Sequence, residues 1–99
     1  MDDFAARADP EGVLWLAGEF DLAVLDAFQA AVDGALQTQR ELVLDLSELT
    51  FLDSTGIRAI LVLAGQVSGG VVIRRPRPPV RRVLDLVRVD GHRGIRIED

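Results

Sequence analysis

The feature that most constrains this chain is an apolar run that gives way to a helical pattern. Leu42–Leu46 is apolar at every position except Asp45, as in interior parallel strands, which are buried on both faces. Beyond Gly56 the apolar spacing becomes helical, and the residues expected to face inward are Ile57, Ile60, Leu61 and Ala64. A buried strand followed directly by an amphipathic helix predicts a βα unit of an α/β domain.

The flanking sequence extends this unit into a short βαβ series. Phe4–Ala8 and Val13–Ala17 are predicted strands, antiparallel across the turn at 9–12. The other predicted elements are helices at 21–36, 54–67 and 80–91, the last ended by Gly91, and strands at 71–73 and 95–97. We expect one α/β domain spanning 1–99, with a mixed sheet of four to five strands and about three helices. Trp15 and Phe28 are expected to fill the interface between sheet and helices.

Composition excludes several classes of function. The 99 residues include no cysteine, which rules out disulfides, thiol catalysis and sulfur-ligated metals, and no lysine, which rules out lysine chemistry. No apolar run approaches the roughly 18 residues of a membrane span. The acidic start, Met1-Asp2-Asp3, does not resemble a signal peptide. These observations predict a cytoplasmic protein without a membrane partner, cofactor or metal.

Charge is distributed unevenly along the chain. Residues 1–57 carry a net −10 and residues 58–99 a net +5, for −5 overall. The basic cluster consists of Arg74, Arg75, Arg77, Arg81 and Arg82. Because the chain is acidic overall and has few aromatic residues, we expect no nucleic-acid partner. The cluster is interpreted as a solvated loop; the alternative is that Arg74 or Arg75 senses a phosphate, since this segment and Ser54 could lie at one edge of the sheet.

Ser54 begins the second predicted helix, just after a buried strand, where function tends to sit in open α/β sheets. Its hydroxyl could cap the helix, or it could carry a phosphate that faces the free N–H groups of the first turn. A catalytic serine would need a base, and the chain has a single histidine, His92, in a polar turn. Leu52 also stands where a nucleophile elbow has its first glycine. We therefore expect no enzyme, although a small hydrolase or phosphotransfer enzyme remains an alternative.

Gly18–Asp21 forms a second polar loop, in which Asp21 is positioned to cap the first helix. This loop follows the second predicted strand, and Asp53-Ser54 follows the third. Since parallel strands end at one edge of a sheet, the two loops are expected to be neighbours on one surface.

Gly18–Asp21, Leu44–Ser47 and Phe51–Gly56 together resemble a STAS domain, the domain shared by sulfate transporters and anti-sigma factor antagonists. The resemblance covers essentially the whole chain and is closest to the free-standing bacterial anti-sigma factor antagonists. The proline-rich entry to the third helix also fits. In place of the last helix of many relatives, this chain has a predicted short strand at Gly94–Glu98.

The resemblance implies partner switching in transcription regulation. An unmodified domain binds an anti-sigma factor of the serine-kinase type and releases the sigma factor. The kinase phosphorylates Ser54, and a PP2C-type phosphatase reverses the modification. The domain is expected to be a monomer. An alternative is a non-phosphorylated STAS adaptor, such as a lipid-transport ATPase subunit or a transporter's regulatory tail.

Helical geometry turns one side of the Ser54 helix outward, and Val62 on that side is interpreted as a contact residue. Arg58 could pair with an acidic partner or with the phosphate. The complete set of residues expected to bind the partner is Glu19, Asp21, Asp53, Thr55, Gly56, Arg58, Ala59, Val62 and Gln66.

Overall fold

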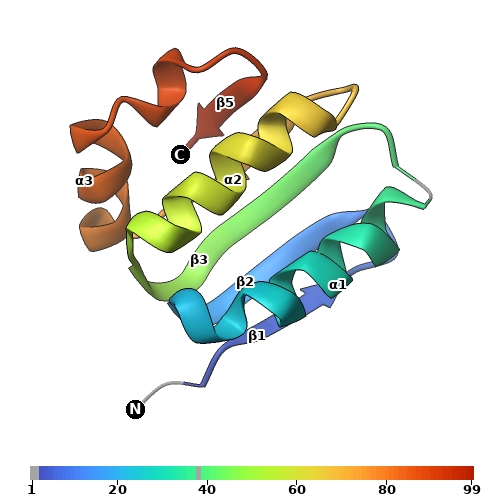
Figure 1. Cartoon of the computed structure of the whole chain (residues 1–99), viewed down its shortest axis with the longest axis horizontal. Coiled ribbons are helices and arrows are strands. Elements are labelled where there is room, and N and C mark those ends of the chain that lie inside the picture. The colour runs from blue at the N-terminus through green and yellow to red at the C-terminus, as the bar shows by residue number, and fades with distance from the viewer. Residues whose placement is uncertain (1–2, 38) are drawn as a thin grey trace.

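The computed structural model describes residues 3–37 and 39–99. Over these residues the chain forms one mixed sheet with helices packed on it (Figure 1). The strands are β1 (Ala5–Ala8), β2 (Val13–Phe20), β3 (Leu42–Leu52), β4 (Val71–Arg74) and β5 (Ile95–Glu98). The α-helices are α1 (Leu25–Leu36), α2 (Ser54–Gln66) and α3 (Pro78–Leu86), and two short 3-10 turns are η1 (Leu22–Val24) and η2 (Val89–Gly91). The predicted α/β architecture is confirmed, and the sheet has five strands.

The strands lie in the order β1-β2-β3-β4-β5. β1 pairs with β2 in antiparallel orientation, and each later pair is parallel. β2 and β3 are both longer than predicted, because they continue past the apolar runs to Phe20 and Leu52. Irregular pairing between Trp15 and Ala17, and again between Gly18 and Glu19, changes the register along this extension. The extended pair positions the two polar loops beyond the rest of the sheet.

α1 and α2 lie side by side over one face of the sheet (Figure 1). Their buried residues pack with the alternate leucines of β2 and β3 in a single core, to which α3 adds Val80 and Leu84. Phe28 is 2% exposed, as expected for a core anchor. Leu63, which the helical pattern had not marked as an inward residue, is also buried at 4% exposed. None of the helices in the described ranges has the length and apolar character needed to cross a membrane.

The prediction for Trp15 was wrong. Leu14 and Leu16 are fully buried in the core, and side chains alternate along a strand, so Trp15 points to the opposite face of the sheet. There its indole N–H donates a 3.0 Å hydrogen bond to Asp9 Oδ2. Phe20 supplies the aromatic anchor instead, with its ring centroid 4.7 Å from that of Phe28. We call the sheet face that carries Trp15 the outer face.

The end of the third helix also differs from the prediction. α3 ends at Leu86, five residues before Gly91, and Arg88 then adopts a left-handed conformation with φ 53°. Gly91 closes the short turn η2. The apolar spacing continued past the helix because Val89, buried at 1% exposed, still packs on the core from this turn.

Candidate functional site

The two polar loops meet at the carboxyl edge of the sheet. β2 and β3 run parallel, and Phe20 pairs with Leu52 at the end of the ladder. Asp21 and Asp53 directly follow these paired residues, one leading into η1 and α1 and the other into α2. The predicted proximity of the two loops is confirmed.

Asp53, and not Ser54, caps α2. The Asp53 Oδ1 atom accepts a 3.0 Å hydrogen bond from the main-chain N–H of Gly56, and the backbone of Asp53 is extended, as in an N-cap residue. Ser54 is consequently the first residue inside the helix. The capping interpretation of its hydroxyl is wrong, because the carboxylate one position earlier already performs that task.

The side chain of Ser54 is exposed. Across residues 3–37 and 39–99, its hydroxyl makes no hydrogen bond to the protein. It therefore lies at the positive end of the α2 dipole, accessible to another macromolecule. A serine in this position is available for modification without the loss of any contact that holds the fold.

In the loop at 18–21, the two acidic residues Glu19 and Asp21 have different environments. Asp21 Oδ1 accepts a 3.0 Å hydrogen bond from the N–H of Ala23, so Asp21 caps the short turn η1 before α1 begins. Glu19 belongs to β2 next to the fully buried Phe20, and alternation places its side chain on the outer face. Glu19 therefore faces away from α1 and α2, and its expected contact with a partner stays a prediction.

A groove of about 250 Å³ lies between α1 and α2. Of the residues expected to bind a partner, the structure brings together five in its wall: Thr55, Arg58, Ala59, Val62 and Gln66. Leu25 and Gln29 of α1 and Leu63 of α2 complete the lining. Val62 is 52% exposed, in agreement with its interpretation as a surface residue.

Gly56 stands apart from that group because it is buried. A Cβ atom at this position would lie 2.4 Å from Leu52 Cδ1 and 3.0 Å from Phe20 Cδ1. The missing side chain lets the first turn of α2 approach the sheet closely. This close approach positions Ser54 at the surface, and the expected contact of Gly56 with a partner stays a prediction.

Two exposed apolar residues near the loops were missed by sequence reasoning. Leu22 in η1 is 68% exposed, and Phe51 near the end of β3 is 46% exposed. Leu22 follows the cap Asp21, and Phe51 precedes the Asp53-Ser54 pair by two positions. The sequence did show an apolar residue beside each polar loop. However, Leu22 could not be distinguished from the apolar stripe of the first helix, nor Phe51 from the apolar pattern of the preceding strand.

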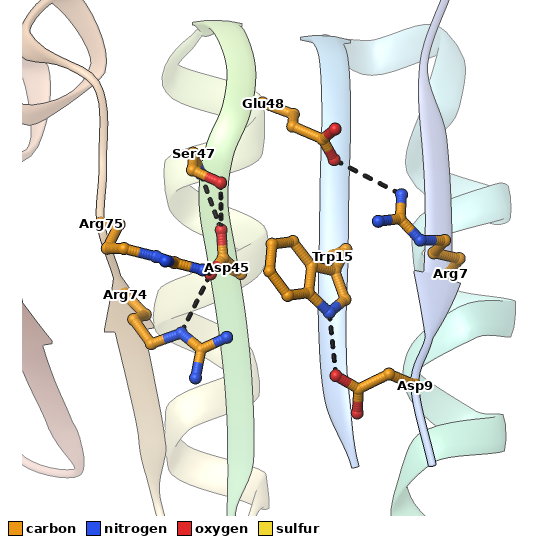
Figure 2. A network of polar contacts seen from close by, with 8 residues as sticks. All are labelled: Arg7, Asp9, Trp15, Asp45, Ser47, Glu48, Arg74 and Arg75. Atoms are coloured by element: carbon orange, nitrogen blue, oxygen red, sulfur yellow. Dashed lines mark hydrogen bonds and ion pairs between the residues drawn. The ribbon is translucent and has the colours of Figure 1, made fainter. Parts of the chain in front are cut away.

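Arg74 and Arg75 are engaged elsewhere, on the outer face (Figure 2). Asp45 Oδ2 accepts hydrogen bonds from Arg74 Nε at 2.9 Å and from Arg75 Nη2 at 2.5 Å. Asp45 lies on β3, eight residues before Asp53, a separation of roughly 26 Å at the rise of a strand. The hypothesis that either arginine senses a phosphate on Ser54 is therefore not supported, and Arg58, one turn into α2, is the better placed cation.

Asp45 itself is a fully buried carboxylate that the sequence had marked only as an interruption of the apolar run. Burial raises the pKa of Asp45, but hydrogen bonds from Ser47 and Arg75 lower it by more, to about 2. The remaining oxygen, Oδ1, accepts from the N–H and the hydroxyl of Ser47 at 2.9 and 2.6 Å. This network joins β3 to β4 and has no connection to the groove between α1 and α2.

His92, the single histidine of the chain, is not placed to act as a base for Ser54. His92 follows η2 and precedes β5, at the amino edge of the parallel strands, whereas Ser54 lies at the carboxyl edge. Among the described residues, no group of three or more His, Cys, Asp or Glu side chains could hold a metal ion. The site is a surface that another protein could contact.

Comparison with known proteins agrees with this geometry. A family model described as "Mlab, STAS domain" matches residues 4–97. This chain belongs to the STAS domain family. A curated STAS relative, the anti-sigma F factor antagonist of Paenibacillus polymyxa, is 34% identical over 79 residues, covering 75% of this chain and 68% of the relative.

Two solved STAS structures share the fold. An anti-sigma factor antagonist from Mycobacterium paratuberculosis superposes with a TM-score of 0.77 at 24% identity, over 97% of this chain and 86% of that one. The anti-sigma factor antagonist SpoIIAA in its unphosphorylated form gives 0.69 at 19% identity, over 96% and 87%. All three relatives are regulatory binding proteins by name, which agrees with the expectation that this STAS domain is not an enzyme.

Proposed function

We propose that this STAS domain is an anti-sigma factor antagonist whose unmodified form binds an anti-sigma factor through the groove between α1 and α2. In this proposal phosphorylation of Ser54 by the anti-sigma factor, acting as a serine kinase, switches binding off, and a PP2C-type phosphatase restores it. The observation that carries the proposal is the exposed hydroxyl of Ser54, which stays free because Asp53 caps the helix. Ser54 immediately precedes Thr55, which lines the groove together with Arg58 and Val62.

Electrostatics explains why the switch would act on binding and not on folding. A phosphoserine carries about −1.5 to −2 charges at neutral pH. At the first position of α2 the helix dipole favours an anion by about 0.3–1 kcal/mol, and Arg58 lies one turn away for pairing. Asp21 and Asp53 offset this gain by repulsion, so the fold changes little in stability.

The interface responds much more strongly than the fold. A like-charge clash that a partner desolvates costs several kcal/mol, and each 1.4 kcal/mol is about a tenfold loss of affinity. The exposed apolar side chain of Leu22, which follows Asp21, would increase the effect, because a partner that covers it also excludes water from the phosphate. Phosphorylation should therefore release the domain from the anti-sigma factor without unfolding the domain.

The modification can be tested directly with the purified domain, ATP and each serine-kinase anti-sigma factor of the same genome. Cleavage at arginine releases the peptide 41–58, which contains Ser47, Thr50 and Thr55 as well as Ser54, so fragment masses must locate the phosphate. We expect it on Ser54 and expect Ser54→Ala to abolish it. Phosphate on Thr55 alone, or on no residue with any of these kinases, would contradict the proposal.

The switch itself is tested by two substitutions of equal size. Ser54→Asp adds a negative charge and Ser54→Asn adds none, so their difference isolates charge from bulk. We expect Ser54→Asp to bind the anti-sigma factor at least tenfold more weakly than Ser54→Asn, with unchanged far-UV circular dichroism. Equal affinities of the two variants would favour the adaptor alternative, in which partner binding does not depend on the charge at this residue.

A further inference from the structure

The solvent side of α3 carries an apolar surface that the proposed switch does not use. Leu86 is 77% exposed and Val87, at the end of the helix, 46% exposed. A hollow of about 550 Å³ lies beside Leu86 and is walled by Pro76 and Pro78. Arg81, Arg82, Asp85 and Asp99 complete its lining. We call this hollow and its rim the α3 surface.

The α3 surface is the basic part of an acidic molecule. Residues 76–88 contain four arginines and one aspartate, a net +3, while the rest of the chain carries −8. Arg81 is paired with Asp85 at 3.0 Å and also with Asp99. Arg77, Arg82 and Arg88 are exposed and form no ion pair within the described residues. Arg82 thus lines the hollow without a counter-charge, and Arg77 stands in the sequence between Pro76 and Pro78 of its wall.

We propose that the α3 surface is a second docking site, which binds an acidic amphipathic segment of another protein. An apolar side chain of that segment would enter the hollow between Pro78 and Leu86, and its carboxylates would pair with Arg77, Arg82 and Arg88. Arginine suits this role because its planar fork bonds a carboxylate through two N–H groups. The rigid prolines hold one wall in place, so little order has to be gained on binding.

The mixture of charges favours a protein segment over a phosphate-rich surface. Asp85 and Asp99 lie in the wall of the same hollow as Arg81 and Arg82. A membrane or a nucleic acid would bring closely spaced phosphates against these carboxylates. A peptide can place an apolar side chain beside Leu86 and its acidic side chains against Arg82 and away from Asp85 and Asp99.

This site is independent of the proposed switch. None of its residues lines the groove between α1 and α2, and Arg82 and Leu86 project from a different helix. A partner held at the α3 surface would therefore stay bound whether or not Ser54 is phosphorylated. A substitution at the α3 surface should therefore weaken this partner without weakening the anti-sigma factor, and a substitution in the groove should do the reverse.

The test uses a labelled peptide of about four helical turns, with leucine at helical spacing and glutamate at its other positions. A control peptide of the same length has glutamine in place of every glutamate. In heteronuclear NMR with the whole domain, we expect the acidic peptide to shift signals of residues 76–88 and the glutamine peptide to bind at least tenfold more weakly. Binding should also weaken as salt is raised, because exposed charges are screened.

Three variants locate the site. Arg82→Glu and Leu86→Ser alter exposed residues of the α3 surface, and each should weaken the acidic peptide at least tenfold with unchanged circular dichroism. Arg93→Glu makes the same charge change outside the surface and should leave affinity within about twofold, as should Ser54→Asp.

Several results would overturn the proposal. They are equal binding of the two peptides, equal effects of Arg82→Glu and Arg93→Glu, or shifts confined to the groove between α1 and α2. Binding of anionic phospholipid vesicles or of duplex DNA in preference to the acidic peptide would also overturn it. So would self-association of the domain in sedimentation that Leu86→Ser abolishes, because the occupant would then be a second copy.

Discussion

The main-chain N–H of Asp53 donates a 3.3 Å hydrogen bond to the carbonyl oxygen of Phe20. This bond crosses from the last residue of β2 to the cap of α2 and joins the two polar loops at the backbone. Phe20 is also fully buried, and its ring packs at a tilt against that of Phe28 of α1. The position of Ser54 is therefore set by the core of the domain, although its side chain is exposed.

The capping assignment predicts that adjacent residues differ in their effect on stability. Asp53→Ala removes the carboxylate that accepts from the N–H of Gly56 and should lower the free energy of unfolding by about 1 kcal/mol. Ser54→Ala removes a hydroxyl without a partner in the described part of the chain and should change it by less than about 0.5 kcal/mol. Urea denaturation measures both. A larger loss for Ser54→Ala than for Asp53→Ala would reverse the assignment.

Val62 and its neighbour Leu63 should separate binding from folding. Val62 is 52% exposed, so Val62→Glu should weaken binding of the anti-sigma factor about tenfold while the stability changes by less than about 0.5 kcal/mol. Leu63 is 4% exposed, and Leu63→Ala should destabilise the domain by about 2–5 kcal/mol. Calorimetry for binding and thermal melting for stability give the two readings. If Val62→Glu melted as early as Leu63→Ala, Val62 would belong to the core.

Two glycines of α2 should respond oppositely to alanine. A methyl group at Gly56 would meet Leu52 Cδ1 at 2.4 Å, so Gly56→Ala should destabilise the domain by about 1–3 kcal/mol. A methyl group at Gly65 meets no atom of the described residues within 4 Å, and Gly65→Ala should stabilise the helix by about 0.5–1 kcal/mol. Chemical denaturation of the two variants provides the comparison. A shift of the same sign in both would contradict the close packing inferred at Gly56.

The buried carboxylate of Asp45 makes the free energy of unfolding depend on pH in the acidic range. Its pKa falls from 3.8 to about 2 in the folded protein, because hydrogen bonds from Ser47 and Arg75 outweigh the cost of burial. The charged form is thus favoured by folding. Its contribution, about 2 kcal/mol, is complete above about pH 5 and is lost as the pH falls through 4 towards 2.

Asp45→Asn should remove this part of the pH dependence. In urea titrations the stability difference between the wild-type chain and Asp45→Asn should shrink by about 2 kcal/mol from pH 6 to pH 2. A constant difference over this range would show that Asp45 titrates alike in the folded and unfolded chains.

Local patterns were sufficient to predict the order of elements, the mixed sheet and the polar site at its carboxyl edge. The useful patterns were the apolar run at 42–46, the helical spacing after Gly56 and the prolines at the start of α3. Each indicates its element through preferences that act within a few residues. Five of the eight residues later found in the groove wall were also predictable, because the outward side of a helix follows from its periodicity.

Other features depended on contacts between residues distant in the sequence. Asp53 and Ser54 are equally suitable caps by residue type, and only the path of the chain out of β3 decided between them. Trp15 has the composition of a core residue, yet the register of β2 placed it on the outer face beside Arg74 and Arg75. Asp45 and its two arginines are 29 and 30 residues apart in sequence, and pairing of β3 with β4 brought them together.

The amino-acid sequence by itself thus determined which segments become strands and helices and which residues stand between them, since these follow from short-range periodicity. Tertiary structure alone decided that Asp53 caps α2 while the hydroxyl of Ser54 stays free. It also decided which face of the sheet Trp15 occupies and which carboxylate each paired arginine contacts. Those outcomes depend on strand register, and a shift of one residue sends every side chain of a strand to the other face.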